Sequence, residues 1–200
     1  MNKKKDSVML LIPAFNEEGR ISKVIKSCKK YFSTIVVIED GSTDLTYKEI
    51  SESSPSVILR HSINCGQGTS LATGIRYFIE HTDYNYLVTF DADEQHLPED
   101  AISMLDYAFK NNFDAVFGSR FLERNSLLHV PKIKIMALKI ARIFENIFFG
   151  ISLSDAHNGL RVLSREACFN LLSLNSSSMA NGTEIAFKLI RAKIKIREFF

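Results

Sequence analysis

The chain has 200 residues, of which 46% are hydrophobic and 24% charged, as in an ordinary globular domain that buries a full core. Its formal net charge is only +2, which excludes a general electrostatic argument for a nucleic-acid partner. The three cysteines are widely spaced and form no zinc-ligand pattern, so we expect buried or free thiols in a reducing compartment.

The N-terminal apolar run is too short and too soon interrupted for a signal peptide, and no apolar stretch approaches the about 20 residues that span a bilayer. We therefore expect a cytoplasmic protein, able to lie on a membrane as a peripheral protein. The composition leaves a homo-oligomer open.

Short apolar runs alternate with helical patterns over the first 120 residues. Strands are predicted at 8–14, 34–39, 56–60, 86–90 and 114–119. Helices are predicted at 17–32, after the DGSTD turn to residue 50, at 68–80 and at 98–111, the last with Pro98 as its first residue. This alternation indicates an α/β fold with a mainly parallel sheet flanked by helices, in which ligands bind at the carboxyl ends of the strands.

The pattern changes after residue 120. Residues 131–149 are predicted to be helical, with a broad apolar surface and basic residues at the polar positions. A strand at 159–164, helices at 165–174 and 182–193, and a final strand in IKIREFF follow. No repeat or linker divides the chain, so we expect a single domain over residues 1–200.

The segment YLVTFDADEQH, residues 86–96, ends a strand in two carboxylates. Alternate side chains of an extended segment share a face, so Asp91, Asp93 and Gln95 are predicted to point the same way. Their oxygen atoms suit Mg²⁺ or Mn²⁺, whose shell is completed by water and substrate phosphate. The alternative is a solvated loop in which one aspartate caps the helix that begins at Pro98. The position at the end of an apolar strand favours the metal site.

The segments IPAFNEE and IEDGSTD follow the first two strands. Pro13 fixes the backbone, Phe15 offers a flat surface to a base, and Asn16 and Glu17 supply hydrogen-bond partners. Asp40 can accept a hydrogen bond from a base or a ribose. Alternatively, Asn16 only caps the following helix and Asp40 only begins a turn.

These segments occur in order with four others: NCGQGTSLATGI, FDADEQH, GSRF and DAHNGLRVLSREA. In this combination the chain resembles glycosyltransferase family 2 over nearly its whole length. It is most similar to the branch of dolichol-phosphate mannose synthase and bacterial polyprenyl-phosphate sugar transferases. The resemblance implies a glycosyltransferase A-type (Rossmann-like) fold, a UDP- or GDP-sugar donor and a divalent cation, Mg²⁺ or Mn²⁺.

The resemblance also assigns residues. It implies a nucleotide-sugar-binding half at 1–120 and an acceptor-binding half at 121–200. The metal and the diphosphate would be held by Asp91, Asp93 and Gln95. The nucleotide would be held by Pro13, Phe15, Asn16, Glu17, Asp40 and Asp91.

The chain departs from the family pattern at two positions. Glu39 stands where the family often has an aspartate, and Gln67 replaces a common lysine, which removes a positive charge near the donor. The GQGTSL run resembles a dinucleotide-binding glycine loop, but it lacks the third glycine and follows the third strand. His96 and His157 are given no role.

Arg120, which ends the fifth strand, has a guanidinium group suited to bidentate phosphate contact. The resemblance places the acceptor phosphate nearby, whereas the alternative is a surface ion pair. Arg161 and Lys134 are further candidates for holding this phosphate. The segment 131–149, which carries Lys134, is predicted either to be a core helix or to lie at a membrane interface among anionic headgroups.

We therefore expect a metal-dependent inverting transfer of a hexose to polyprenyl phosphate, with Asp93 and Arg120 as the catalytic residues. An acceptor phosphate is already anionic and needs no strong base, which fits the absence of the ED and QxxRW-like motifs of relatives that transfer to hydroxyl groups. The alternatives are transfer to a saccharide hydroxyl in surface polysaccharide synthesis, with Glu184 as base, and a catalytically idle homologue that binds a nucleotide or a protein.

Overall fold

A mixed seven-stranded sheet forms the centre of the computed structural model, which describes residues 7–119, 153–174 and 181–199. The strand order is β3-β2-β1-β4-β6-β5-β7. Only β6 runs antiparallel to its neighbours, β4 and β5, so the expected mainly parallel sheet is confirmed. The strands are β1 (Val8–Ala14), β2 (Thr34–Glu39), β3 (Val57–Arg60), β4 (Tyr86–Thr89), β5 (Ala115–Gly118), β6 (Arg161–Ser164) and β7 (Ile196–Phe199).

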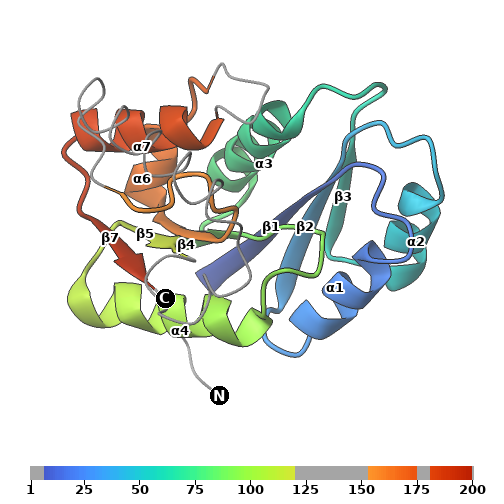
Figure 1. The fold of residues 1–200 in the computed structure, drawn as a ribbon, viewed down its shortest axis with the longest axis horizontal. Helices are drawn as coiled ribbons and strands as arrows, with labels where there is room; N and C mark the ends of the chain where they lie inside the picture. Colours follow the sequence, from blue (N-terminus) through green and yellow to red (C-terminus); the bar gives the residue numbers. More distant parts are fainter. Residues whose placement is uncertain (1–6, 120–152, 175–180, 200) are drawn as a thin grey trace, which may run out of the picture.

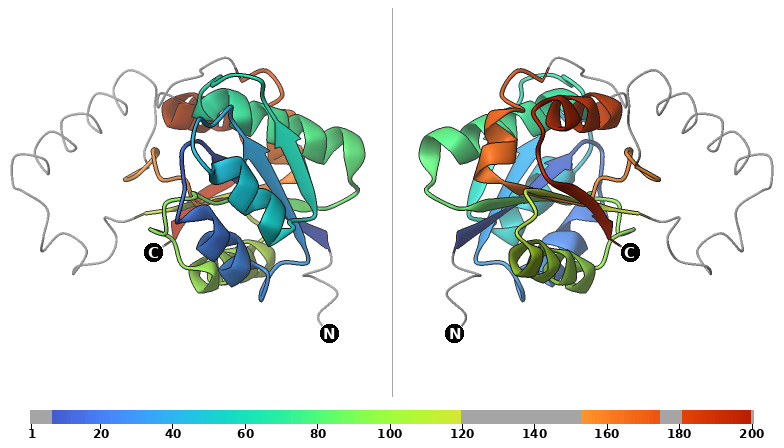
Figure 2. Two further views of the ribbon diagram at one scale, coloured as in Figure 1. Left: turned by 90° about the vertical axis from the view of Figure 1, so that its right-hand side faces the viewer. Right: turned by 90° about the vertical axis from the view of Figure 1, so that its left-hand side faces the viewer.

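Helices cover both faces of this sheet. One face carries α1, α2 and α4, and the other carries α3, α6 and α7 (Figure 1). The turned views show the sheet nearly edge-on between these two layers (Figure 2). The helices are α1 (Ile21–Cys28), α2 (Thr46–Ser53), α3 (Gln67–His81), α4 (Pro98–Asn111), α6 (Arg165–Phe169) and α7 (Asn181–Arg191).

Two of the predicted helices are shorter than expected. The first begins at Ile21 rather than residue 17, because a turn precedes it in which Arg20 N–H donates to Glu17 O. The helix predicted at 165–174 ends at Phe169 and continues only as turns. The predicted helix at 131–149 lies outside the described residues.

The central strand β1 is buried on both of its faces. Val8, Leu10 and Ile12 belong to the core beneath α1 and α4, and Met9 and Leu11 belong to the core beneath α3 and α6. This explains why its sequence is a continuous apolar run rather than an alternating one. Within the described ranges, no helix has the length and apolar character needed to cross a membrane.

The carboxyl ends of β1, β2, β4 and β5 meet at one edge of the sheet. Because β6 runs the opposite way, its first residue rather than its last lies at this edge, with Arg161 paired to Thr89 of β4. The topology therefore brings a cationic side chain from the second half of the chain to the strand ends of the first half.

Close packing of α3 on β1 requires a glycine at position 74. A Cβ atom there would lie 2.3 Å from Leu11 Cδ1. We predict that Gly74→Val lowers the free energy of unfolding by about 1–3 kcal/mol, because the added side chain overpacks the interface.

Urea unfolding followed by circular dichroism measures this effect as a lower midpoint at an unchanged slope. The exposed Arg76 of the same helix supplies the control, Arg76→Ala, which should change stability by less than about 0.5 kcal/mol. Equal midpoints for both variants would contradict the packing argument.

Candidate active site

A cavity of about 370 Å³ opens at the carboxyl ends of the strands. It is lined by the end of β1, by residues that follow β1, β2, β3 and β4, by the start of α3 and by His157. Most of the predicted donor and metal residues line it together: Pro13, Phe15, Glu17, Asp40, Asp91, Asp93 and Gln95.

Asn16 holds the neighbouring loop instead of lining the cavity. Its N–H donates to Ser42 Oγ at 3.1 Å, and its Oδ1 accepts from Thr43 N–H at 3.0 Å. The N–H of Glu17 donates to Thr46 Oγ1 at 2.7 Å. The loops after β1 and β2 are therefore tied together, and Asn16 is not the cap of α1, whose N-cap is Arg20.

Glu39 supports the same loop from inside the protein. Its side chain is fully buried and accepts hydrogen bonds from Ser42 N–H and, at 2.8 Å, from Arg60 Nε. The longer glutamate in place of the family's aspartate thus has a structural partner on each oxygen. It does not line the cavity.

Asp40 is held in a ring of donors from the segment after β3. Its Oδ1 lies 2.6 Å from His61 Nδ1 and accepts from Cys65 N–H at 2.9 Å, and its Oδ2 accepts from Gly66 N–H at 2.8 Å. The ligand atoms of Asp40, His61 and Cys65 lie within 4.8 Å of one another, a donor set that zinc accepts. Because both carboxylate oxygens already accept hydrogen bonds, the arrangement is better explained as a device that fixes Asp40.

The loop after β4 presents Asp91 and Asp93 to the cavity. Asp91 Oδ1 accepts from Gln67 Nε2 at 3.3 Å, and its Oδ2 lies 3.1 Å from His96 Nε2. Asp93 Oδ1 accepts from Gln95 N–H at 3.1 Å. The alternative, in which an aspartate caps α4, is wrong, because the N-cap residue is Leu97, whose side chain forms no capping hydrogen bond.

The charges around the cavity favour a bound cation. Burial raises the pKa of Glu17; the Arg20 guanidinium, 2.8 Å away, lowers it, and the carboxylates of Asp93, Asp44 and Asp91 raise it. Four carboxylates, those of Glu17, Asp40, Asp91 and Asp93, thus line one cavity. Oxygen donors in this arrangement fit a hard divalent cation, which removes the repulsion.

Arg161 is a buried cation beside this loop. Its side chain is 2% exposed, its Nη2 donates to Ala156 O at 3.3 Å, and its guanidinium lies 5.7 Å from the ring centre of Phe117. Desolvation lowers its pKa to about 10, while Asp91 and Asp155 raise it, so the group is charged at neutral pH. Its burial separates it from the cavity, whose lining does not include it.

A glycine lets Asp91 approach the loop before β6. A Cβ atom at Gly159 would lie 1.9 Å from Asp91 Oδ2. Thr89 Oγ1 donates to Gly159 O at 2.6 Å, which fixes this backbone against β4. No larger residue fits between Asp91 and the β6 segment without moving the carboxylate.

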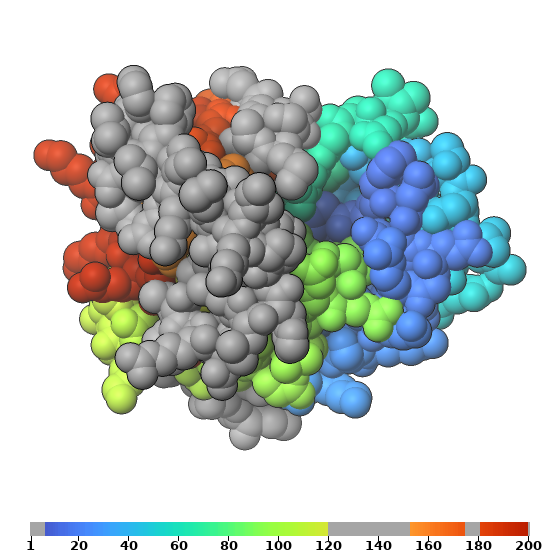
Figure 3. Space-filling model, viewed as in Figure 1, coloured from blue at the N-terminus to red at the C-terminus, as the bar shows by residue number. Residues whose placement is uncertain are grey.

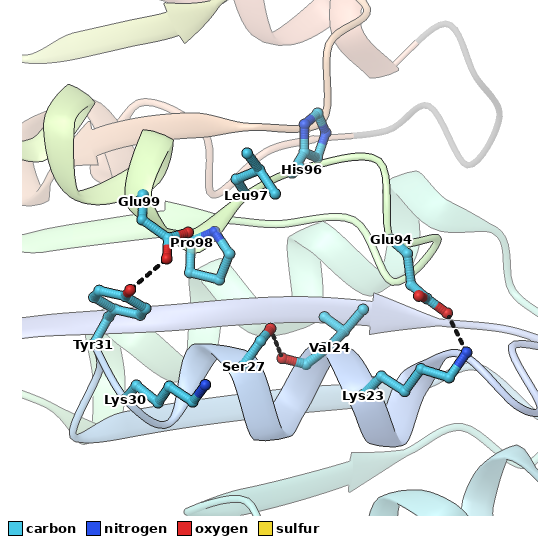
Figure 4. A pocket seen from close by; sticks show the side chains of 10 residues that line it. All are labelled: Lys23, Val24, Ser27, Lys30, Tyr31, Glu94, His96, Leu97, Pro98 and Glu99. Atoms are coloured by element: carbon cyan, nitrogen blue, oxygen red, sulfur yellow. Dashed lines mark hydrogen bonds and ion pairs between the residues drawn. The ribbon is translucent and has the colours of Figure 1, made fainter.

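A second cavity, of about 320 Å³, lies between α1 and the segment that leads into α4 (Figure 4). At its edge, Lys23 Nζ pairs with Glu94 at 3.1 Å, and Glu94 has a left-handed backbone with φ of 66°. Tyr31 donates to Glu99 at the other end. Figure 3 shows the surface of the α1 region adjoining the green segment after β4. The acidic loop is thereby anchored to α1 by one exposed ion pair, which contributes little to stability.

The candidate acceptor residues differ in where they lie. Arg120 and Lys134 lie outside the described residues. Glu184, the candidate base, lies on α7 and pairs with Lys188 at 3.3 Å. The neighbouring Thr183 Oγ1 lies 3.4 Å from the ring of His157, which lines the cavity.

Sequence reasoning missed the residues that hold the site in place, which are His61, His96 and Gly159. It noted Gln67 only as a departure, although its amide reaches Asp91. A signal was present for His96 alone, because it follows Gln95 in the acidic segment; the other contacts join positions far apart in the chain.

Comparison with known proteins identifies the family. The profile described as Glycosyl transferase family 2 matches residues 9–171. The chain belongs to glycosyltransferase family 2. An uncharacterised protein of Methanocaldococcus jannaschii is 31% identical to it over 97% of this chain and 80% of that protein. A UDP-N-acetylglucosamine–dolichyl-phosphate N-acetylglucosaminyltransferase of Methanococcus voltae is 28% identical over 80% of this chain and 70% of that protein.

A solved structure confirms the fold of this glycosyltransferase. Glucosyl-3-phosphoglycerate synthase from Mycobacterium tuberculosis, crystallised with Mn²⁺, uridine-diphosphate-glucose and phosphoglyceric acid, matches with a TM-score of 0.71. The match covers 96% of this chain and 68% of that one at 18% identity. The glycosyltransferase A-type fold expected from the sequence is therefore confirmed.

The buried charge of Arg161 generates a prediction. Arg161→Met removes the cation near Asp91 and Asp155 and should lower the free energy of unfolding by about 3–5 kcal/mol. Chemical denaturation measures the loss. Arg76, which is exposed on α3, supplies the matched control, because Arg76→Met should change stability by less than about 0.5 kcal/mol. If Arg161→Met were as stable as this control, the guanidinium would not balance these carboxylates.

Proposed function

We propose that this glycosyltransferase moves a hexose from a nucleotide-diphosphate sugar to polyprenyl phosphate in a metal-dependent, inverting reaction. The observation that carries the proposal is the convergence of Asp40 and Phe15 with Asp91, Asp93 and Gln95 in one cavity. The Methanococcus voltae relative is named for transfer to dolichyl phosphate, which supports a lipid phosphate as acceptor.

The donor half is assigned to residues 1–120. Phe15 is 38% exposed at the cavity and offers a flat apolar surface to the base, and Asp40 accepts a hydrogen bond from it. Pro13 and Glu17 complete the wall, while Asn16 keeps the loops after β1 and β2 together. The nucleoside therefore binds between preformed loops and loses little energy to their ordering.

The acidic loop is assigned to the cation. Asp91, Asp93 and Gln95 would hold Mg²⁺ or Mn²⁺, which when bound neutralises charge on the departing diphosphate. Gln67 and His96 orient the Asp91 carboxylate from two sides. Arg161 supplies a buried positive charge beside Asp91.

The acceptor half is assigned to residues 121–200. An oxygen of the acceptor phosphate attacks the anomeric carbon while the bond from that carbon to the diphosphate breaks, and the diphosphate leaves with the electron pair. One displacement of this kind inverts the configuration at the anomeric carbon. Positioning of the attacking phosphate is assigned to Arg120 and Lys134. Arg161, also a sequence candidate for this contact, is buried away from the cavity and acts beside Asp91 instead. Contact with the cytoplasmic face of a membrane, as a peripheral protein, is assigned to the segment 131–149.

Replacing Asp93 tests the metal assignment. Asp93→Asn should lower kcat by about 100-fold or more, because the cation loses a charged ligand in the transition state. Product formation is measured with a panel of nucleotide sugars, with Mg²⁺ or Mn²⁺ and a short polyprenyl phosphate. Asp106→Asn, on the exposed face of α4, is the control and should keep full activity.

Two outcomes would contradict the proposal. Product with a saccharide acceptor and none with lipid phosphate would overturn the acceptor, and would then favour a transferase to hydroxyl groups. The enzymatic role would be overturned if no transfer were seen and if nucleotide affinity were the same with and without the metal and in Asp93→Asn.

A further inference from the structure

We propose that this cavity selects a uracil base, so that the donor is a uridine-diphosphate sugar rather than a guanosine-diphosphate sugar. The inference rests on the proposed function, because it takes Asp40 as the residue that meets the base. What carries it is the number of hydrogen bonds that Asp40 already accepts from the protein.

An ionised carboxylate has about four lone-pair sites, two on each oxygen. In Asp40, Oδ1 accepts from His61 Nδ1 at 2.6 Å and from Cys65 N–H at 2.9 Å. Oδ2 accepts from Gly66 N–H at 2.8 Å. Three of the four sites are therefore occupied, and a single site on Oδ2 remains for a ligand.

Close backbone packing holds these hydrogen-bond donors against Asp40. Asp40 is only 3% exposed, although it lines the cavity, so a ligand meets one edge of the carboxylate. The segment after β3 passes so near Gly41 that a Cβ atom there would lie 2.4 Å from the carbonyl carbon of Ile63. Gly41 has a φ of +69° and Gly66 a φ of +90°, conformations that favour glycine. The donors of Cys65 and Gly66 are thus held against Asp40 by the chain itself.

His61 is fixed as well. A carboxylate accepts hydrogen bonds, so Nδ1 carries the proton that points to Asp40. The other ring nitrogen, Nε2, lies 3.0 Å from Thr73 Oγ1 on α3. The imidazole is therefore held between α3 and Asp40, and it cannot turn away to free a second acceptor site without losing both contacts.

The bases differ in what they offer to one acceptor. Uracil presents one donor, N3–H, between two carbonyl oxygens, and one lone pair satisfies it. Guanine presents two adjacent donors, N1–H and N2–H, and one of them stays unpaired at Asp40 when the base is buried. Cytosine and adenine offer only an exocyclic amino group as a donor. That contact brings the unprotonated ring nitrogen next to it toward the carboxylate, and the two lone pairs repel each other. A donor left without a partner in a buried site lowers affinity strongly.

Equilibrium titration of the whole chain with UDP, CDP, GDP and ADP, each with Mn²⁺, tests the inference. UDP should bind about tenfold or more tightly than each of the others. Among the four bases, uracil alone meets Asp40 without leaving a donor unpaired and without turning an acceptor toward the carboxylate. UDP and CDP form the sharpest pair, since they share the ribose, the diphosphate and the metal and differ only at the base edge.

Variants of His61 show whether Asp40 is the cause. His61→Ala removes a donor and the restraint on the carboxylate, and should reduce the ratio of UDP to GDP affinity several-fold. His61→Asn keeps a side-chain N–H donor and should restore part of the ratio. The melting temperature of each variant reports whether the fold is intact, and the wild-type panel decides the base preference without any variant.

The outcomes separate the two proposals. If no nucleoside diphosphate binds the wild-type chain with Mn²⁺, the proposed function itself fails. If nucleotides bind but GDP binds as tightly as UDP or more tightly, the function stands and the uracil inference is overturned. A UDP preference that is unchanged in His61→Ala would overturn the role given to the saturated carboxylate.

Discussion

A buried positive charge balances the acidic loop at the end of β4. Arg161 reaches this position only because β6 runs antiparallel between β4 and β5, which puts its first residue at the edge where the parallel strands end. Asp91 lies against Gly159, two residues before that arginine, so carboxylate and cation belong to one packed unit. The buried positive charge of Arg161 offsets part of the repulsion among the carboxylates that line the cavity.

The site also depends on loops that hydrogen bonds tie to one another. The loop after β1 is bonded to the loop after β2, and that loop is bonded through Asp40 to the segment after β3. Each contact joins a side chain to a backbone N–H or places a glycine where no other residue fits. The polar groups are therefore positioned by backbone geometry, which is stiffer than a network of long side chains.

The sequence predicted the strands well, because continuous apolar runs and turn residues mark buried strands locally. It also placed Asp40, Asp91 and Asp93 at strand ends, from which their meeting in one cavity follows. It could not predict the direction of β6 or the burial of Arg161, since both depend on pairing between segments more than 70 residues apart, as between Tyr86 and Ser164. The contact between His61 and Asp40 could not be predicted either, because no local sequence pattern indicates it.

The strand order prevents the two halves of the chain from being separated as independent units. In the described sheet β4 and β5 do not touch; they are joined through β6, and β7 closes the far side of β5. A fragment that ended near residue 120 would leave β5 with neither of these neighbours and β4 with an open edge. The proposed donor half (residues 1–120) and the proposed acceptor half (residues 121–200) thus contribute strands to one hydrogen-bonded sheet. Chimaeras that exchange these halves between relatives would have to rebuild the centre of the sheet, so donor and acceptor preferences are more readily altered through loops than through domain exchange.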